Sequence, residues 1–341
     1  MRMMLWSTVL LYSSILVLHV TAGAVNTAGC PADCVLIIGG MNEAVLNGAA
    51  SDDDIYTDVE VYPESCRPPV PDLPVLNSVT GSYQGRVVSC GGVNMTSPEY
   101  GTLVLDCFTL SLDNTWDSMA PLNMARTQFY SVLVEVGPYL VAMFTPYDGL
   151  TTMEVYDGEN WSMRPDLESG LADFPETVDL TTGQFIATGD SELSYVKNNL
   201  IFSLDINTGT WSRQDMAAPD GDDETMFQAK VLRINNDILN GIIRTGGTNF
   251  AKSTNVSTFM SLGDGSEEWD TFPPLTTPRF AHAMLAINET VMVFGGAEYN
   301  MGQVLPAYRS TEALVGGRWV KAQPMKKGRL GHKVILISCD N

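Results

Sequence analysis

Histidine is the side chain most often used for proton transfer and metal binding, and this chain contains only three. His19 lies near the N-terminus, whereas His282 and His332 each end an Arg-x-x-His motif. Because the two motifs occupy corresponding positions in adjacent units of a repeat, we expect both histidines to support the framework. We therefore assign no catalytic residue, metal site or cofactor to this sequence.

The six cysteines form the second group of reactive side chains. They include no Cys-x-x-Cys pair, and their spacings do not match a zinc site. An even number of cysteines in a secreted protein indicates disulfide bonds. We expect disulfides among all six, which are Cys30, Cys34, Cys66, Cys90, Cys107 and Cys339.

Acidic residues outnumber basic ones, 40 to 19, and give the chain a net charge of −21. This charge repels a polyanion over most of the surface, so we expect no nucleic-acid partner. The densest acidic runs, residues 52–54 and 220–223, lack the alternating ligands and closing glutamate of a calcium loop. No Gly-x-Ser-x-Gly elbow, phosphate-binding loop or dinucleotide fingerprint occurs. A glycosidase carboxylate pair cannot be selected from so many acids, so the motifs specify no enzyme.

An apolar stretch at residues 5–20 is followed by Ala22-Gly23-Ala24, which resembles a signal-peptide cleavage site. Polar residues interrupt the stretch, and it is shorter than the roughly 20 residues that a membrane span needs. We expect cleavage and secretion, the alternative being a retained membrane anchor. No later segment of the sequence is long enough to span a membrane. Four glycosylation sequons fit the secretory route: Asn94, Asn160, Asn255 and Asn288.

A repeat of about 50 residues runs through the rest of the chain. Its first marker is a tryptophan, usually followed closely by proline: Trp116, Trp161, Trp211, Trp269 and Trp319. A second marker is a short β-branched run closed by a glycine pair, ending at Gly40, Gly92, Gly247 and Gly296. Residues 141–145 and 185–189 fill the two gaps in degraded form. Two further markers are a short apolar motif, as in Glu60-Val-Tyr62 and Glu154-Val-Tyr156, and an arginine after the tryptophan, at Arg126, Arg279 and Arg329.

These markers indicate short strands bounded by turns, with no convincing helical period. A four-stranded sheet cannot bury both faces alone, so such units must stack, and stacking in a ring protects most strand edges. The ordered markers resemble the kelch repeat over residues 35–338. This resemblance implies an all-β, six-bladed β-propeller, although units three and four have degraded glycine pairs and unit one has Cys66 in place of tryptophan.

We divide the chain into a signal peptide (1–24), a lead-in (25–34) and a propeller (35–341). Residues 329–337 match residues 279–287, but the chain then stops, so we expect this last strand to join the first blade and close the ring. A disulfide from Cys339 to Cys34 or Cys30 would fasten that closure. Cys90 and Cys107 flank two adjacent strands and form our second candidate pair, which leaves Cys66 with the remaining N-terminal cysteine.

Among kelch propellers, galactose-oxidase-like enzymes bind copper through paired histidine and tyrosine ligands. Here the two histidines lie inside repeat strands, so we expect no copper site. We predict a secreted, non-enzymatic binding or scaffold protein for an extracellular protein or glycan. The alternatives are a carbohydrate-active or small-ligand-binding propeller that uses the channel mouth, and a structural matrix component. The variable loops that would bind are residues 41–57, 94–102, 190–199, 218–226, 248–256 and 297–309.

Overall fold

The computed structural model describes residues 33–48, 52–63, 69–94, 102–127, 131–143, 152–164, 184–187, 192–197, 200–215, 229–235, 239–249, 251–262, 269–287 and 290–338. Regular structure in these residues is almost entirely β-strand, as expected from short runs of β-branched residues separated by turns. One α-helical turn, α1 (Glu43–Leu46), and one 3₁₀ turn, η2 (Asp52–Asp54), are also present. No helix in the described part of the chain is long and apolar enough to cross a membrane.

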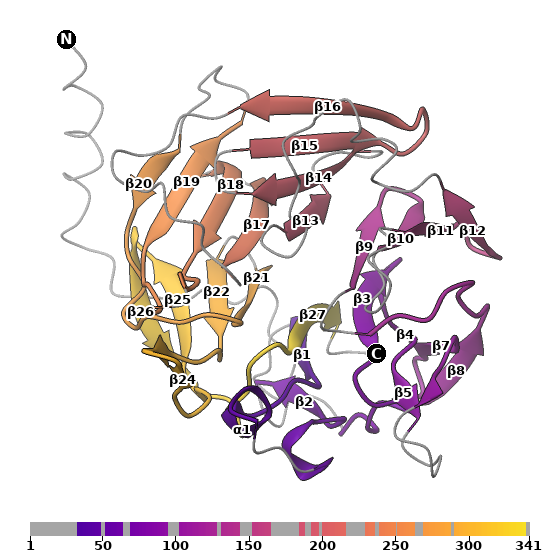
Figure 1. Cartoon of the computed structure of the whole chain (residues 1–341), viewed down its shortest axis with the longest axis horizontal. Coiled ribbons are helices and arrows are strands. Elements are labelled where there is room, and N and C mark those ends of the chain that lie inside the picture. Colours follow the sequence, from indigo (N-terminus) through magenta and orange to yellow (C-terminus); the bar gives the residue numbers. More distant parts are fainter. Residues whose placement is uncertain are drawn as a thin grey trace.

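Six sheets lie around a common centre, and we number them as blades in chain order (Figure 1). Blade 1 contains β2 (Val59–Tyr62), β1 (Asp33–Ile38) and β27 (Lys333–Ser338). Blade 2 contains β3 (Val79–Tyr83), β4 (Arg86–Cys90), β7 (Cys107–Leu110) and β8 (Trp116–Met119). Blade 3 contains β9 (Val132–Val136), β10 (Tyr139–Met143), β11 (Met153–Tyr156) and β12 (Trp161–Arg164).

The remaining blades follow the same antiparallel order, from the inner strand outwards. Blade 4 contains β13 (Gln184–Ala187), β14 (Glu192–Lys197), β15 (Leu200–Asp205) and β16 (Thr210–Asp215). Blade 5 contains β17 (Lys230–Asn235), β18 (Asn240–Thr245), β19 (Ser257–Ser261) and β20 (Asp270–Phe272). Blade 6 contains β21 (Ala283–Ile287), β22 (Thr290–Phe294), β25 (Thr311–Val315) and β26 (Arg318–Ala322). Two-stranded hairpins lie in the connections of blades 2 and 6: β5 (Val93–Asn94) with β6 (Thr102–Leu103), and β23 (Tyr299–Asn300) with β24 (Gln303–Val304). The predicted six-bladed, all-β architecture is confirmed.

The first and last strands of the described chain belong to the same sheet. β1 lies between β2 and β27, with Cys34 opposite Ile337 and Ile38 opposite Lys333. The inner strands β27, β3, β9, β13, β17 and β21 contact one another in this order, and β21 in turn contacts β27. The last strand therefore pairs with the first, as the repeat alignment predicted.

Blade 4 corrects two of our predictions. We matched residues 185–189 to the runs that a glycine pair closes, which are second strands in the other blades, but Gln184–Ala187 forms the inner strand β13. Residues 190–199 were predicted to be a variable loop, yet Glu192–Lys197 forms the second strand β14. The error arose because inner and second strands are both short apolar runs, and a lone glycine does not distinguish them.

The glycine pairs lie where a blade closely approaches the chain that leads into the next blade. Gly295 has a φ of +58°, and a Cβ there would lie 2.6 Å from the backbone oxygen of Arg329 and 2.8 Å from Cε1 of His332. Any side chain would therefore combine an unfavourable backbone conformation with a clash. The pairs that end at Gly40, Gly92, Gly247 and Gly296 all have positive φ at both glycines.

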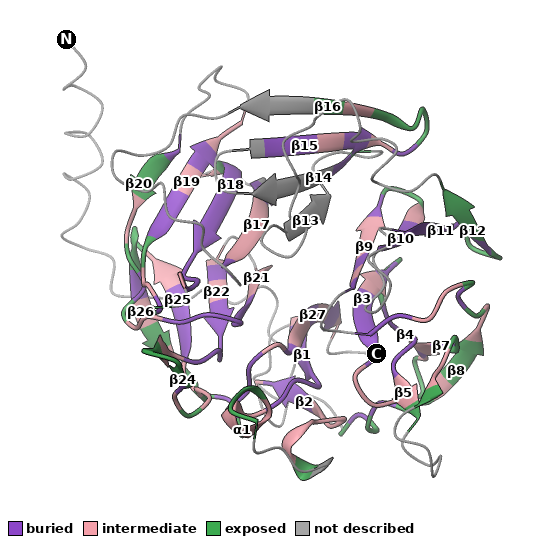
Figure 2. Ribbon diagram, viewed as in Figure 1, coloured by how far each residue is buried: buried purple, intermediate pink, exposed green. Residues whose placement is uncertain are grey.

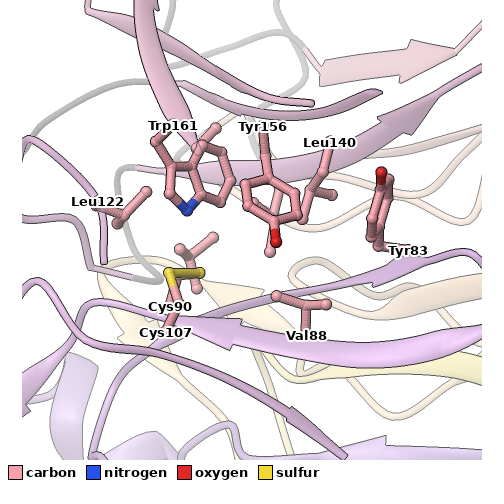
Figure 3. Close-up of a cluster of buried hydrophobic side chains, with 11 residues drawn as sticks. Tyr83, Val88, Cys90, Cys107, Leu122, Leu140, Tyr156 and Trp161 are labelled. Atoms are coloured by element: carbon pink, nitrogen blue, oxygen red, sulfur yellow. A yellow bond between two sulfur atoms is a disulfide. The ribbon is translucent and has the colours of Figure 1, made fainter. Parts of the chain in front are cut away.

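The tryptophans join neighbouring blades. Trp161 on β12 packs into a buried cluster with Cys90, Leu122 and Tyr156, which come from blades 2 and 3 and the segment between them (Figure 3). Its Nε1 donates a 3.0 Å hydrogen bond to the carbonyl of Ala120, beyond the outer strand of blade 2. Burial is greatest in second strands such as β1, β4 and β18, whereas outer strands such as β8 and β12 carry exposed residues (Figure 2).

Corresponding tryptophan bonds recur around the ring. Trp319 Nε1 donates to the carbonyl of Pro273 at 2.8 Å, and Trp116 Nε1 donates to that of Pro71 at 3.2 Å. Pro71 therefore occupies the position that Ala120 and Pro273 hold in their blades. This agrees with our alignment of Cys66 in unit one with the tryptophans of the other units.

Candidate interaction face

All the variable connections that follow a second strand leave the propeller on one face. In each blade the first residue of the inner strand lies beside the end of the second strand, as Val79 does with Cys90 and Ala283 with Phe294. The connections from second to third strand therefore start at the same end of every blade. We call this end the insertion face; it carries the described parts of four predicted loops, at residues 41–57, 94–102, 248–256 and 297–309. Residues 218–226 lie outside the described part of the chain.

The insertions of blades 1 and 6 hydrogen bond directly to each other. Asn47, at the end of α1, donates from Nδ2 to the carbonyl of Val304 at 2.9 Å and accepts from the Val304 amide at 3.1 Å. The Glu43 carboxylate accepts a 3.0 Å bond from the amide of Ala307. In Figure 1, α1 lies beside β24 at the lower edge of the ring. Two segments about 260 residues apart in sequence therefore act as one element of the surface.

The insertion of blade 5 joins the same hydrogen-bonded arrangement. The amide of Ser253 donates to the carbonyl of Tyr299, and the Tyr299 amide donates to Oγ of Ser253, both at 2.8 Å. The amide of Met301 donates to the carbonyl of Ala251 at 2.9 Å. Residues 41–48, 251–256 and 297–309 thus form a continuous surface across blades 5, 6 and 1, which we call the three-blade surface.

Exposed apolar side chains gather on the insertion face. Six large hydrophobic residues in the described part of the chain are exposed, namely Leu46, Leu105, Leu112, Met163, Val256 and Met301. Four of these lie in connections from second to third strands: Leu46, Leu105, Val256 and Met301. Met301 is 90% exposed at the tip of the β23–β24 hairpin, and Leu46 is 46% exposed at the end of α1. Exposed apolar residues gathered on one face are typical of interaction surfaces.

A buried ion pair supports the insertion face from below. The Arg279 guanidinium lies 2.5 Å from the Glu312 carboxylate, and both side chains are buried. Arg279 also donates to the carbonyl of Gly295 at 2.6 Å, and its own carbonyl accepts a 2.8 Å bond from the amide of Gly247 in blade 5. Glu312 accepts a further bond from the amide of Thr276 at 2.7 Å. This arrangement connects blade 6 to blade 5 and satisfies backbone groups beneath the loops.

The other two arginines of the repeat make equivalent contacts. Arg126 lies 2.9 Å from Glu154, and Arg329 pairs with Asp58 and lies 3.7 Å from Glu60. Burial lowers the pKa of Arg126 and of Arg279, and the paired glutamate opposes this change in each case. The short apolar motif thus supplies Glu154 as a buried counter-ion for Arg126 and places Glu60 near Arg329.

The sequence analysis did not identify several residues that contact the repeat arginines. Glu312 occupies the position of Glu60 and Glu154 but lacks the tyrosine that completes that motif. Tyr308 was also missed, and its ring lies 5.3 Å from the Arg279 guanidinium. Tyr56 stands in the same relation to Arg329, at 5.1 Å. Burial and the nearby Glu298 raise the pKa of Tyr308 to about 12, so its ring covers the cation as a neutral phenol. The matching positions of Tyr56 and Tyr308 in their units were the available signal.

The two repeat histidines fill the space between glycine pairs of adjacent blades. His282 contacts the places where Gly246 and Gly296 would carry a Cβ, and its Nε2 lies 2.9 Å from Oγ1 of Thr245. His332 packs in the same way between Gly295 and Gly40. Burial lowers the pKa of both imidazoles well below the ordinary value, and nearby cations add to the effect. This packing agrees with the framework role that we predicted.

The structure joins Cys90 and Cys107 in a disulfide across the paired strands β4 and β7, as we proposed from the sequence. Cys34 is also disulfide-bonded, and no cysteine in the described residues is free. Cys30, Cys66 and Cys339 lie outside those residues, so the pairing of Cys34 stays a prediction.

The glycosylation sequons differ in their surroundings. Asn160 is exposed in the turn before β12, and Asn94 is exposed at the end of β5. The Asn255 side chain is partly buried, and its Nδ2, the atom that a glycan would occupy, donates to the carbonyl of Leu275 at 2.9 Å. Asn288 is outside the described residues. Of the three described sequons, Asn94 and Asn160 therefore have the more open side chains.

A hollow of about 430 Å³ lies on the insertion face beside blade 2. It is lined by residues 74–76 together with Val93, Asn94, Val104, Asp106 and Phe108. This lining provides one carboxylate and one aromatic ring, not the converging carboxylates that sugar hydrolysis needs. Within the described residues, no three His, Cys, Asp or Glu side chains are grouped to hold a metal ion.

Comparison with known proteins gives a local similarity to kelch proteins. The chain is 30% identical over 82 residues to Kelch repeat protein C2 of vaccinia virus (strain Western Reserve), and the same figures hold for the proteins of that name from cowpox virus (strain GRI-90 / Grishak) and camelpox virus (strain CMS). The match covers 24% of this chain and spans only 15% of the length of each relative. No family model matches the sequence. With six blades and repeated glycine, tryptophan and arginine positions, the similarity identifies this chain as a kelch-repeat β-propeller.

Proposed function

We propose that this propeller is a non-enzymatic scaffold that binds another protein through the three-blade surface. One observation carries the proposal: four of the six exposed large hydrophobic residues in the described chain lie on the insertion face. Two of them, Leu46 and Met301, lie on insertions that hydrogen bond to each other through Asn47 and Val304. Apolar anchors within a polar rim are the usual composition of a protein interface.

The support beneath this surface favours binding. A surface that is already ordered loses less conformational entropy when a partner docks. The insertions are held by backbone hydrogen bonds between blades, and the Arg279–Glu312 and Arg329–Asp58 pairs lie below them. The strongly acidic chain would also attract a partner with a basic surface and accelerate association at low salt.

We further propose that binding occurs outside the cell, as for a secreted glycoprotein. The apolar leader, the sequons and the cysteine content support this location. A glycan partner or a small ligand remains the alternative to a protein. Those ligands need convergent polar groups more than exposed aliphatic anchors.

The test compares matched arginine substitutions on opposite faces. Leu46→Arg combined with Met301→Arg places charges on the three-blade surface. Leu112→Arg is the control, because Leu112 is 61% exposed in the β7–β8 connection on the opposite face. Proteins recovered with each tagged variant from its native medium would be quantified by mass spectrometry.

We expect a stoichiometric protein partner to be retained by wild type and Leu112→Arg and reduced at least about tenfold by the double variant. Equal recovery by all three forms would contradict the proposed surface. Reproducible absence of any protein partner from wild type would contradict the protein-binding function.

A further inference from the structure

Two lysines begin the inner strands of blades 5 and 1 at the insertion face. Lys230 is the first residue of β17, and Lys333 is the first residue of β27. Both side chains are partly exposed, and neither has a hydrogen-bond or ion-pair partner among the described residues. Lys230 lies opposite Thr245 and Lys333 opposite Ile38, so both occupy the same level immediately beside a glycine pair. Two unpaired cations at equivalent places are unusual in a chain with a net charge of −21.

The two lysines belong to the blades on either side of blade 6. The charge of Lys333 adds to burial in lowering the pKa of Lys230 to about 7. The inner strand β21 of blade 6 contacts both β17 and β27, so the strand ends that carry the two lysines converge at the inner edge of blade 6 (Figure 1). The corresponding first residue of β21 is Ala283, which carries no charge.

The inner strands provide no acid at this level. Their other first residues are Val79, Val132, Gln184 and Ala283. Glu135, the acid on β9, lies toward the opposite face, where it accepts a 2.8 Å bond from the amide of Gln84. The positive charge at the insertion-face end of the inner strands is therefore not neutralised by these strands.

Two imidazoles adjoin the lysines and supply further nitrogen atoms. His332 immediately precedes Lys333, is 2% exposed, and has no hydrogen-bond partner in the described residues at either ring nitrogen. His282 precedes β21, and its Nδ1 is likewise without a partner there. Both imidazoles pack against the glycine pair of blade 6, His332 at Gly295 and His282 at Gly296, and the charge of Lys230 lowers the pKa of both. A neutral imidazole can donate one N–H to an anion.

We propose that the inner edge of blades 5, 6 and 1 binds a small oxyanion between Lys230 and Lys333. Unpaired cations that are partly removed from water are unfavourable, and an oxyanion would offset this with charge-assisted hydrogen bonds. Two ammonium groups fit a ligand with two negative charges, either on one phosphate-like group or on the two ends of a dicarboxylate. This site lies inside the ring and is independent of the proposed protein-binding surface.

The test measures binding of inorganic phosphate, sulfate and succinate by titration calorimetry, with thermal unfolding at constant ionic strength as a second readout. Lys230→Met and Lys333→Met are compared, singly and together, with Lys321→Met on the outer strand β26, where the lysine is exposed. Removing unpaired cations should not prevent folding, so loss of binding can be assigned to the site. Preference for phosphate and sulfate over succinate would assign a single tetrahedral group, and the reverse a dicarboxylate.

We expect wild type and Lys321→Met to bind one of these ions and to unfold at higher temperature in its presence. The double variant should bind at least about tenfold more weakly and lose the thermal shift.

Sulfate affinity should fall as the pH rises through about 7, because Lys230 then loses its proton. The neighbouring His282 and His332 are neutral in this range, and Arg279 and Arg329 remain paired with Glu312 and Asp58. Wild-type affinity in the double variant, or no ion that stabilises wild type more than chloride does, would overturn the proposal.

Discussion

The guanidinium of Arg279 and the carboxylate of Glu312 lie 2.5 Å apart with at most 1% of either side chain exposed. Each group also bonds to backbone that the insertion face requires, Arg279 to Gly295 and Glu312 to Thr276. Removing either partner leaves a buried charge and frees backbone polar groups. The pair is therefore central to how blade 6 presents its insertion.

The first prediction concerns this pair. Glu312→Leu or Arg279→Leu should each lower the free energy of unfolding by about 3–5 kcal/mol, because the remaining charge is buried without its partner. The double variant should lose less than the sum of the two single losses. Urea unfolding of the four proteins completes the cycle. Additive losses would show that the two groups act independently.

Glycine substitutions provide a matched comparison. Gly295→Ala introduces a Cβ within 2.6 Å of the Arg329 carbonyl oxygen at a φ of +58°, whereas Gly316→Ala meets nothing within 4 Å at a φ of +56°. We expect Gly316→Ala to cost about 1 kcal/mol for the backbone conformation alone. Gly295→Ala should cost several times more, because the clash adds to the same conformational penalty. Thermal or urea unfolding measures both, and similar costs would contradict the role of close approach.

The histidines predict an acid-sensitive fold. Their pKa in the folded chain lies well below 6.5, so the unfolded chain binds more protons once the pH drops below that value. The free energy of unfolding should then fall with decreasing pH, by up to about 1.4 kcal/mol per pH unit for each histidine. The slope should be shallower in His282→Gln and His332→Gln than in wild type. An unchanged slope would mean that neither imidazole resists protonation.

The disulfide of blade 2 should stabilise the fold. Cys90 and Cys107 are 17 residues apart and lie opposite each other on paired strands. Replacing both with serine should cost about 3 kcal/mol, mainly through greater freedom of the unfolded chain. Leu112→Arg, on the hairpin of the same blade, serves as a control that keeps the bond. A loss below about 1 kcal/mol would indicate that the pairing of β4 with β7 is stable without the disulfide.

The sequence predicted the framework better than the surface. The tryptophans, glycine pairs and arginines recur because each makes the same contact between neighbouring blades in successive units. Their spacing therefore indicated six blades and the pairing of the last strand with the first. Blade 4 was misassigned because its glycine pair is lost and its inner strand resembles a second strand. The contacts of Asn47 with Val304 connect segments far apart in sequence and belong to no repeat position, so no periodic signal could reveal them.

Among the site residues too, those at repeat positions were predictable and those brought together only by the fold were not. His282 and His332 were correctly placed in the framework because they share a repeat position. Lys230 and Lys333 also share a strand position, but blade 6, which lies between their blades, has Ala283 at that position. The residues that precede the two lysines also differ, Ala229 in one case and His332 in the other. Only the inner-strand register brings the two lysines to one level.

The most direct test of the central claim is amine-reactive cross-linking of the native protein with its partner, followed by mass spectrometry. Lys252 is exposed on the three-blade surface, and Lys327 has a 52% exposed side chain between β26 and β27 on the insertion face. Lys321 is exposed on the outer strand and serves as the internal control. The proposed function predicts links from a stoichiometric protein partner to Lys252 and Lys327 but not to Lys321. Partner links confined to Lys321 would contradict it.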